Sequence, residues 1–159
     1  MIHTRRARAT PVWPPSRRAA FSVPVPCDTE RDMNSTRLGA VMAFLGVAAG
    51  AFGAHGLRSR VDAALLVVFE TGVRYHLVHA LALLVLAALP LTPRSMRVAT
   101  WAFLTGIVLF SGSLYVLALT NEKSLGAITP FGGTAFLIGW IAVAVGAKQN
   151  RGRASPSGP

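Results

Sequence analysis

Four long apolar stretches without charged residues constrain this chain more than any other feature of its sequence. They cover residues 38–57, 75–93, 98–121 and 124–147. Each is 19 to 24 residues long, close to the roughly 20 residues that a helix needs to cross about 30 Å of hydrocarbon. Helices of a soluble bundle keep a polar face, and these stretches have none. The sequence therefore predicts an all-α membrane protein, a compact bundle of four transmembrane helices.

The chain divides into one membrane domain and two tails. We expect four helices, at about 38–57, 62–90, 96–119 and 127–147. They lie within a membrane domain at 33–148, and the segments at 1–32 and 149–159 are expected to be disordered because they offer little apolar surface to bury. Residues 1–32 also fit an over-extended start, since Met33 stands just ahead of the first apolar stretch.

Local signals suggest how some of the helices begin, bend and end. Gly56 is expected to end the first helix in the left-handed conformation. The apolar pattern from 61 to 91 would exceed the hydrocarbon thickness as one straight helix, so it predicts a tilt, an interfacial first part or a bend near residues 71–72. In "TPFGG", either Thr129 caps the fourth helix with Pro130 in its first turn, or the helix is broken there.

The formal net charge is +10. The distribution of the Lys and Arg residues along the chain fits a membrane topology better than it fits nucleic-acid binding. With both termini in the cytoplasm, 12 Lys and Arg residues fall on that side and 4 on the other. Cytoplasmic segments of membrane proteins are enriched in Lys and Arg. We therefore predict a multi-pass protein of the cell inner membrane with both termini cytoplasmic, in contact with the lipid bilayer and not with nucleic acid.

Small residues at helical spacing indicate close helix packing. Gly46 and Gly50 form a G-x-x-x-G pair, and 102–106 and 135–139 repeat the spacing of four with Ala and Gly. Such residues let helix backbones approach, which strengthens van der Waals contact within a membrane. The predicted packing positions are Gly46, Gly50, Gly53, Gly106, Gly112 and Gly139. The same abundance of small residues favours a homo-oligomer or a membrane-protein partner.

Polar side chains near the ends of the first two helices form the candidate site. They are His55, Glu70, Arg74, Tyr75 and His79. Glu70 and Arg74 are spaced i, i+4 in the favourable order for an ion pair, and His76 and His79 are spaced i, i+3. Two interpretations stay open: hydrogen bonds that tie the first two helices together, or a small-ligand or proton site. A metal site needs three or four clustered ligands, so no metal is predicted.

Four sequence motifs together point to a known family. In chain order they are "GAFGAHGL", "FETGVRYHLVHALALL", "LFSGSLYVLAL" and "ITPFGGTAFLIGW". The chain resembles the domain of unknown function 423 family, the YgdD-like small inner-membrane proteins, over about residues 38–147. The resemblance implies four transmembrane helices and no assigned activity. It also argues against a metal-binding pair of His76 and His79, because other members carry different polar residues at position 76.

The sequence favours a structural or accessory membrane component. The alternative is a small-molecule or proton-coupled transporter that uses the group His55, Glu70, Arg74 and His79. An enzyme is not expected, because the sequence has no nucleotide-binding loop, no ordered Ser-His-Asp set and no thiol chemistry. No cofactor is expected either.

Overall fold

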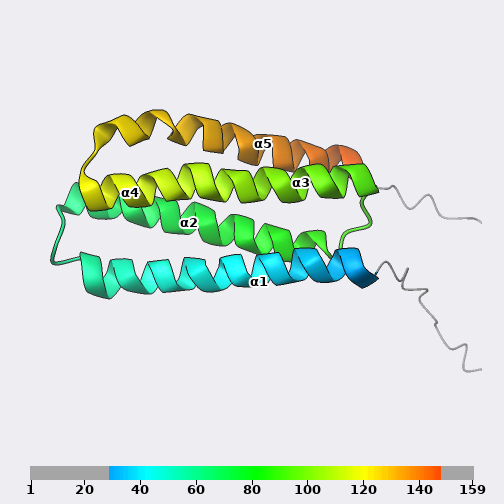
Figure 1. Ribbon diagram of the computed structural model, residues 1–159, viewed down its shortest axis with the longest axis horizontal. Helices are drawn as coiled ribbons and strands as arrows, with labels where there is room; N and C mark the ends of the chain where they lie inside the picture. The colour runs from blue at the N-terminus through cyan, green and yellow to red at the C-terminus, as the bar shows by residue number, and fades with distance from the viewer. Residues whose placement is uncertain (1–28, 148–159) are drawn as a thin grey trace, which may run out of the picture.

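Four helical rods lie side by side and run alternately up and down the bundle (Figure 1). The computed structural model describes residues 29–147, and their side chains from residue 35 onward. The rods that are long and apolar enough to cross a membrane are Ser35–Leu57, Ala63–Leu86, Pro93–Thr120 and Lys123–Gly146. The predicted all-α, four-helix membrane fold is therefore confirmed. The predicted tails lie outside the described residues, apart from residues 29–32.

The first rod consists of α1 (Thr29–Phe52) and a π-helical turn, η1 (Gly53–Leu57). Residues 29–32, predicted to be disordered, thus belong to α1. The prediction for Gly56 was wrong, because no glycine in the described chain has a positive φ. The helical conformation simply continues through η1 to Arg58, so no left-handed residue is needed at this end.

The second rod is one helix, α2 (Ala63–Leu86). Its 24 residues span roughly 36 Å at about 1.5 Å per residue, which needs only a modest tilt to fit a membrane. The predicted end at residue 90 was too late, because the apolar sequence after Leu86 forms a loop. This loop is tied to the end of the fourth rod by a hydrogen bond from Thr92 N to Gly146 O of 3.1 Å.

The third rod changes its helical type in the middle. It comprises α3 (Pro93–Gly106), a π-helical turn η2 (Ile107–Ser111) and α4 (Gly112–Thr120). Pro93 occupies the first turn of α3, where its missing N–H costs nothing. The rod ends at Asn121, whose φ of 56° is the one left-handed backbone among the described non-glycine residues.

The fourth rod starts with a 3₁₀ turn, η3 (Lys123–Ala127), and continues as α5 (Thr129–Gly146). The hydroxyl and amide of Ser124 donate to the Glu122 carboxylate, which holds the pKa of Glu122 below its usual value of 4.5. Pro130 lies in the first turn of α5, and no break follows at "TPFGG". Thr129 does not cap the helix, because its hydroxyl bonds to Ser113 Oγ at 3.0 Å instead.

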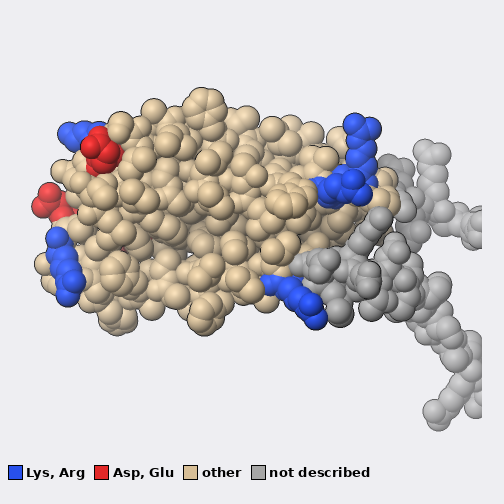
Figure 2. Space-filling model, viewed as in Figure 1, with Lys and Arg blue, Asp and Glu red and all other residues tan. Residues whose placement is uncertain are grey.

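Two apolar clusters hold the rods together. The larger joins α2, the α2–α3 loop, the third rod and α5 through Ala82, Leu83, Leu86, Leu91, Ala99, Phe103, Ile107 and Phe136. The smaller, near the opposite end, contains Leu57, Phe69 and Ala118. On the face drawn in Figure 2, charged side chains lie at the two ends of the bundle and leave an uncharged band between them. The band is the surface expected to meet hydrocarbon.

Candidate functional site

His79 lies in the middle of the bundle with both ring nitrogens engaged. Its Nδ1 is 2.7 Å from the Tyr75 carbonyl oxygen, and Trp140 Nε1 donates to its Nε2 at 3.2 Å. Because a carbonyl only accepts and an indole N–H only donates, the ring is neutral with its proton on Nδ1. The side chain is 4% exposed. This geometry ties α5 to α2 by a hydrogen bond.

Aromatic rings surround His79 on the remaining sides. We call them the aromatic cluster: Tyr75, Phe103, Phe110, Phe136 and Trp140. Phe136 stacks directly on the imidazole, with ring centroids 3.5 Å apart. Tyr75 stands at the edge and is 45% exposed. The cluster therefore fills the space between α2, the third rod and α5 with rings.

Two glycines make room for this cluster in a reciprocal way. A Cβ placed on Gly106 of α3 would collide with Phe136 of α5. A Cβ placed on Gly139 of α5 would collide with Phe103 of α3. Each helix thus inserts one ring above a glycine of the other. Both glycines are among the predicted packing positions, and each lies against a ring of the facing helix.

His76 is buried on another side of α2, between α1 and α4. Its Nδ1 is 3.2 Å from the Tyr115 hydroxyl, and its Cδ2 lies against α1 at Gly46. Nε2 has no hydrogen-bond partner among the described residues. The Met42 carbonyl lies near the ring without completing a well-aligned bond to that nitrogen. His76, which the resemblance made less favoured as a metal ligand, instead brings its ring into contact with both α1 and α4.

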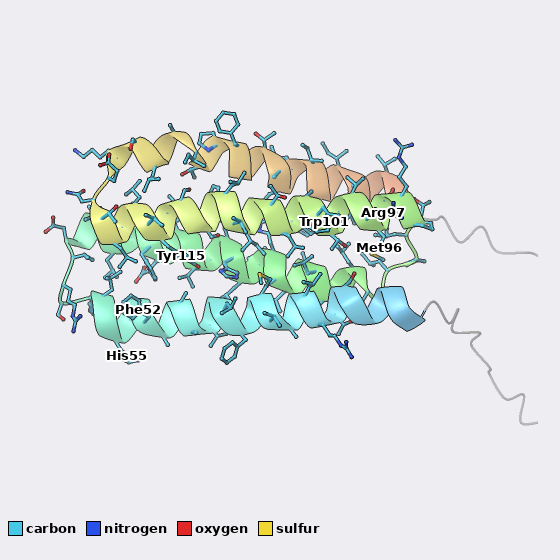
Figure 3. The ribbon with its side chains drawn as sticks, viewed as in Figure 1. Phe52, His55, Met96, Arg97, Trp101 and Tyr115 are labelled. Carbon is cyan, nitrogen blue, oxygen red and sulfur yellow. The ribbon has the colours of Figure 1, made fainter. Side chains whose placement is uncertain are left out.

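The other three predicted polar residues do not join this buried region. His55, Glu70 and Arg74 are exposed, and Figure 3 places His55 at the far end of the first rod, on its outer side. No ion pair links Glu70 to Arg74 in the described chain. No three His, Cys, Asp or Glu side chains between residues 29 and 147 come close enough to hold a metal ion. The structure therefore does not assemble the five-residue polar group.

The other predicted packing glycines differ in whether a neighbouring helix lies close to them. A Cβ on Gly46, Gly50 or Gly53 would lie 2.7 to 3.3 Å from side chains of α2, so these glycines set the α1–α2 contact. Gly112 is wrong, because a Cβ there would meet nothing within 4 Å. Gly132, which is not among the predicted packing positions, lets α5 touch the backbone of Phe110.

Two serines next to the π-helical turn differ sharply in their hydrogen bonding. Ser113 Oγ donates to the Phe110 carbonyl at 2.9 Å and also contacts Thr129 Oγ1, as expected for a serine in a membrane helix. Ser111 Oγ is fully buried and has no partner in the described chain. Only Ser113 links two rods.

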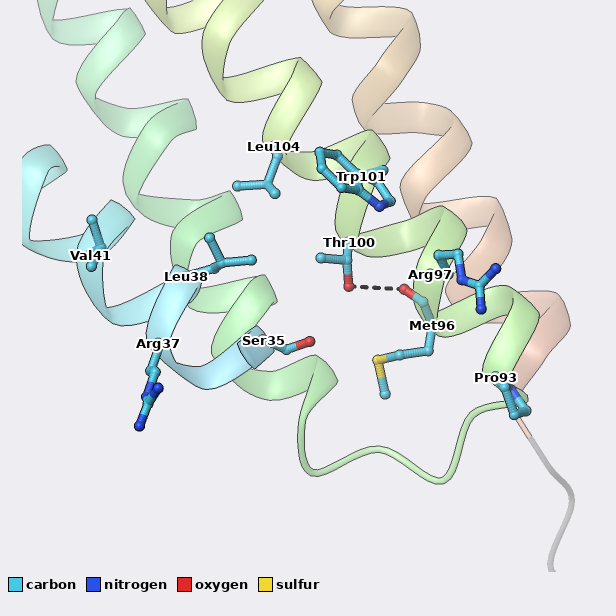
Figure 4. A pocket seen from close by; sticks show the side chains of 10 residues that line it. All are labelled: Ser35, Arg37, Leu38, Val41, Pro93, Met96, Arg97, Thr100, Trp101 and Leu104. Carbon is cyan, nitrogen blue, oxygen red and sulfur yellow. Dashed lines mark hydrogen bonds between the residues drawn. The ribbon is translucent and has the colours of Figure 1, made fainter. Parts of the chain in front are cut away.

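A groove between α1 and α3 was not predicted from the sequence. It has a volume of about 550 Å³, lies near the end where α1 and α3 begin, and is flanked by Arg37 and Arg97 (Figure 4). The signal in the sequence was an arginine just before the first and the third apolar stretch, Arg37 and Arg97, with Trp101 one turn after Arg97. Which two helices would stand beside each other could not be inferred from that signal.

Comparison with known proteins agrees with this membrane architecture. The model of a protein family described as "Protein of unknown function (DUF423)" matches residues 49–133. The chain belongs to the DUF423 family. The matched region includes all five residues of the predicted polar group and ends before Trp140.

Several curated relatives of this DUF423 member are named as membrane proteins. The UPF0382 membrane protein YwdK of Bacillus subtilis is 51% identical over 115 residues, which cover 70% of this chain and 94% of YwdK. A UPF0382 membrane protein of Haemophilus influenzae is 43% identical, with 70% and 91% covered. No solved structure matches the chain. The family and the four apolar rods together establish a multi-pass membrane protein.

Proposed function

We propose that this protein is an accessory membrane component that acts by binding another transmembrane helix, from a second copy or from a partner protein. It carries out no transport or enzymatic chemistry of its own. It resides in the cell inner membrane with both termini in the cytoplasm. The observation that carries the proposal is an exposed stripe on α1.

The stripe repeats with the spacing of helices that pack side by side. Its members are Ala40, Phe44, Val47, Ala51 and Ala54, all of them exposed. Their spacing of four, three, four and three residues is the heptad pattern that keeps one seam facing a partner helix. The three alanines permit close approach of a second backbone.

The position of α1 leaves this stripe free within the bundle. α1 packs mainly against α2 and uses its glycines Gly46, Gly50 and Gly53 for that contact. The stripe lies on other sides of the helix, where Phe44 is 73% exposed and Val47 is 62% exposed. A helix held by one neighbour has room for a second.

The interior of the bundle supports an accessory role over transport or catalysis. The rings of the aromatic cluster fill the region around His79. Both nitrogens of that histidine are already hydrogen-bonded, so it offers no free base or proton acceptor. A transporter needs a polar path through the midplane, and three of the four groups predicted to form one, His55, Glu70 and Arg74, lie on the exposed surface.

The charge distribution supports the orientation. α1 begins and α5 ends at the same end of the bundle (Figure 1). Arg37, Arg94 and Arg97 lie at that end, and most of the Lys and Arg residues come before Ser35 or after Ala147 in the sequence. Such a bias supports a cytoplasmic position for this end.

Cysteine cross-linking in native membranes tests the proposed α1 interface. The chain has one cysteine, Cys27, so a C27S background allows single cysteines to be introduced at chosen positions. We expect V47C, on the stripe, to give a disulfide-linked dimer or a defined adduct with one partner under mild oxidation. V145C is the matched control, because Val145 is 79% exposed on α5 but lies off the stripe. Equal cross-linking of both variants, or none from V47C, would refute the interface.

A further inference from the structure

The groove between α1 and α3 is lined by residues that follow one another along both helices. One wall comes from the start of α1, and the other comes from a single face of α3 (Figure 4). The α3 residues that line it are Pro93, Met96, Arg97, Thr100, Trp101 and Leu104. Their i, i+3, i+4 spacing covers eleven steps, or roughly 17 Å along the helix axis. The groove thus extends from the membrane surface about halfway into the hydrocarbon.

The chemistry of the groove changes with depth. Both helices begin at the same end, so residue number increases with depth on each wall (Figure 1). Arg37 and Arg97 are the charged residues of the lining and lie at its shallow end, where their guanidinium groups extend outward and away from each other (Figure 4), while Val41, Trp101 and Leu104 lie deeper. The hydroxyl of Thr100 is occupied by a 2.9 Å bond to the Met96 carbonyl, so it adds no free donor to the lower part. A cationic mouth thus stands above an apolar channel.

Charges on the two ends of the bundle differ in kind. In the part of the chain with described side chains, the groove end carries Arg37, Arg94 and Arg97 and no acidic residue. The opposite end mixes both signs: Arg58, Arg60, Asp62, Glu122 and Lys123. Neither arginine at the groove mouth forms an ion pair with residues 35–147. Within residues 35–147, no acidic side chain competes for these guanidinium groups with an anion from the lipid headgroup region.

We infer that this groove binds an anionic phospholipid. In this complex the headgroup phosphate lies at the shallow end of the groove, where the exposed side chains of Arg37 and Arg97 turn towards it from either side, and one acyl chain runs along Val41, Trp101 and Leu104. Guanidinium groups match phosphate oxygens with paired N–H donors, and basic pockets between transmembrane helices hold anionic headgroups in this way. A free phosphate would use only the mouth and leave the apolar channel empty. The ligand is therefore a lipid and not a soluble anion.

Native mass spectrometry of the full chain in mild detergent measures this binding directly. Phosphatidylglycerol is titrated against phosphatidylcholine of the same acyl chains, and the fraction of protein carrying one lipid is recorded. We expect preferential binding of phosphatidylglycerol. The variant R37Q/R97Q should weaken it roughly 25-fold, about fivefold for each arginine. R58Q/R60Q, at the other end, is the matched control and should bind as the wild type does.

A second variant tests the apolar channel without changing any charge. V41W places a large ring in the groove, and Val41 is 53% exposed, so the helix itself tolerates the change. We expect V41W to lose phosphatidylglycerol binding while its circular dichroism and unfolding midpoint stay those of the wild type.

Three results would overturn the inference. The first is equal phosphatidylglycerol binding by R37Q/R97Q and R58Q/R60Q. The second is displacement of the lipid by glycerol 3-phosphate at equal concentration, which would assign the mouth to a soluble anion. The third is a dimer that R37Q/R97Q dissociates with no change in bound lipid, which would assign the groove to a second copy of the chain.

Discussion

The contact between Gly106 and Phe136 gives the sharpest test of how α3 and α5 fit together. In Gly106→Ala the added methyl would overlap the Cδ1 and Cε1 atoms of Phe136 and lie 2.9 Å from its Cγ. Carbon atoms that pack well are about 3.5 to 4.0 Å apart. The ring cannot move away easily, because it is 4% exposed and stacks on His79 with centroids 3.5 Å apart. Either the helices separate or the stack is broken.

The expected magnitude comes from two opposing effects. Overpacking of a well-packed core costs about 1–3 kcal/mol, while alanine is favoured over glycine inside a helix by about 1 kcal/mol. Gly112→Ala is the matched control on the same rod, because a Cβ there meets nothing within 4 Å. We therefore expect Gly106→Ala to have a free energy of unfolding about 1–3 kcal/mol below that of Gly112→Ala.

Equilibrium unfolding by sodium dodecyl sulfate in mixed micelles, followed by circular dichroism, measures the difference. Combining Gly106→Ala with Phe136→Leu should remove most of the penalty, because the overlapping ring atoms are gone. Neighbouring residues of this kind show coupling energies of about 0.5–3 kcal/mol. If Gly106→Ala is as stable as Gly112→Ala, or if the double variant shows no coupling, the proposed ring-on-glycine contact is refuted.

Three other substitutions can be ranked with the same unfolding assay. W140F removes the donor to the buried histidine and should lower the free energy of unfolding by about 0.6–2 kcal/mol, whereas W101F, at a ring that is 65% exposed, should change it by less than about 0.5 kcal/mol; equal effects would argue against the hydrogen bond. S113A should cost about 0.6 kcal/mol, while S111A should be neutral or stabilising because its hydroxyl has no partner; the reverse order would contradict the assignment. Asn121→Gly should keep the fold, and Asn121→Val should lose about 1–2 kcal/mol because its φ is 56°; equal stability of the two would show that the left-handed turn is absent.

Hydropathy reveals the depth of a residue in the membrane but not the direction that its side chain takes around the helix. The lengths of the apolar stretches sufficed to predict four rods and their approximate ends. The bond between His79 and Trp140 joins residues that are 61 positions apart. It depends on which rods are neighbours and how each is rotated, and neither is encoded in a local pattern. His55, on an equally apolar stretch, turns outward.

The glycines illustrate the same limit. Spacing of four identifies positions where a helix can be approached closely, and Gly106 and Gly139 meet rings there. It does not say whether a partner arrives. Gly112 has no neighbour near its missing Cβ, while Gly132, which was not predicted as a packing position, touches a helix backbone. Where four helices run in parallel and antiparallel order, the same spacing is compatible with several partners.

The π-helical turn at Ile107–Ser111 has a consequence for how one membrane segment can serve two neighbours. Its mark is the hydrogen bond from Gly112 N to the Ile107 carbonyl, five residues back. One additional residue in a helical turn shifts the azimuth of everything after it by about 100°. Before the turn the rod directs Phe103 towards α5, and after it Tyr115 faces α2. The inserted residue lets α3 and α4 differ in their rotation about the common axis of the rod. The face of α3 can therefore fit α5 while the face of α4 fits α2.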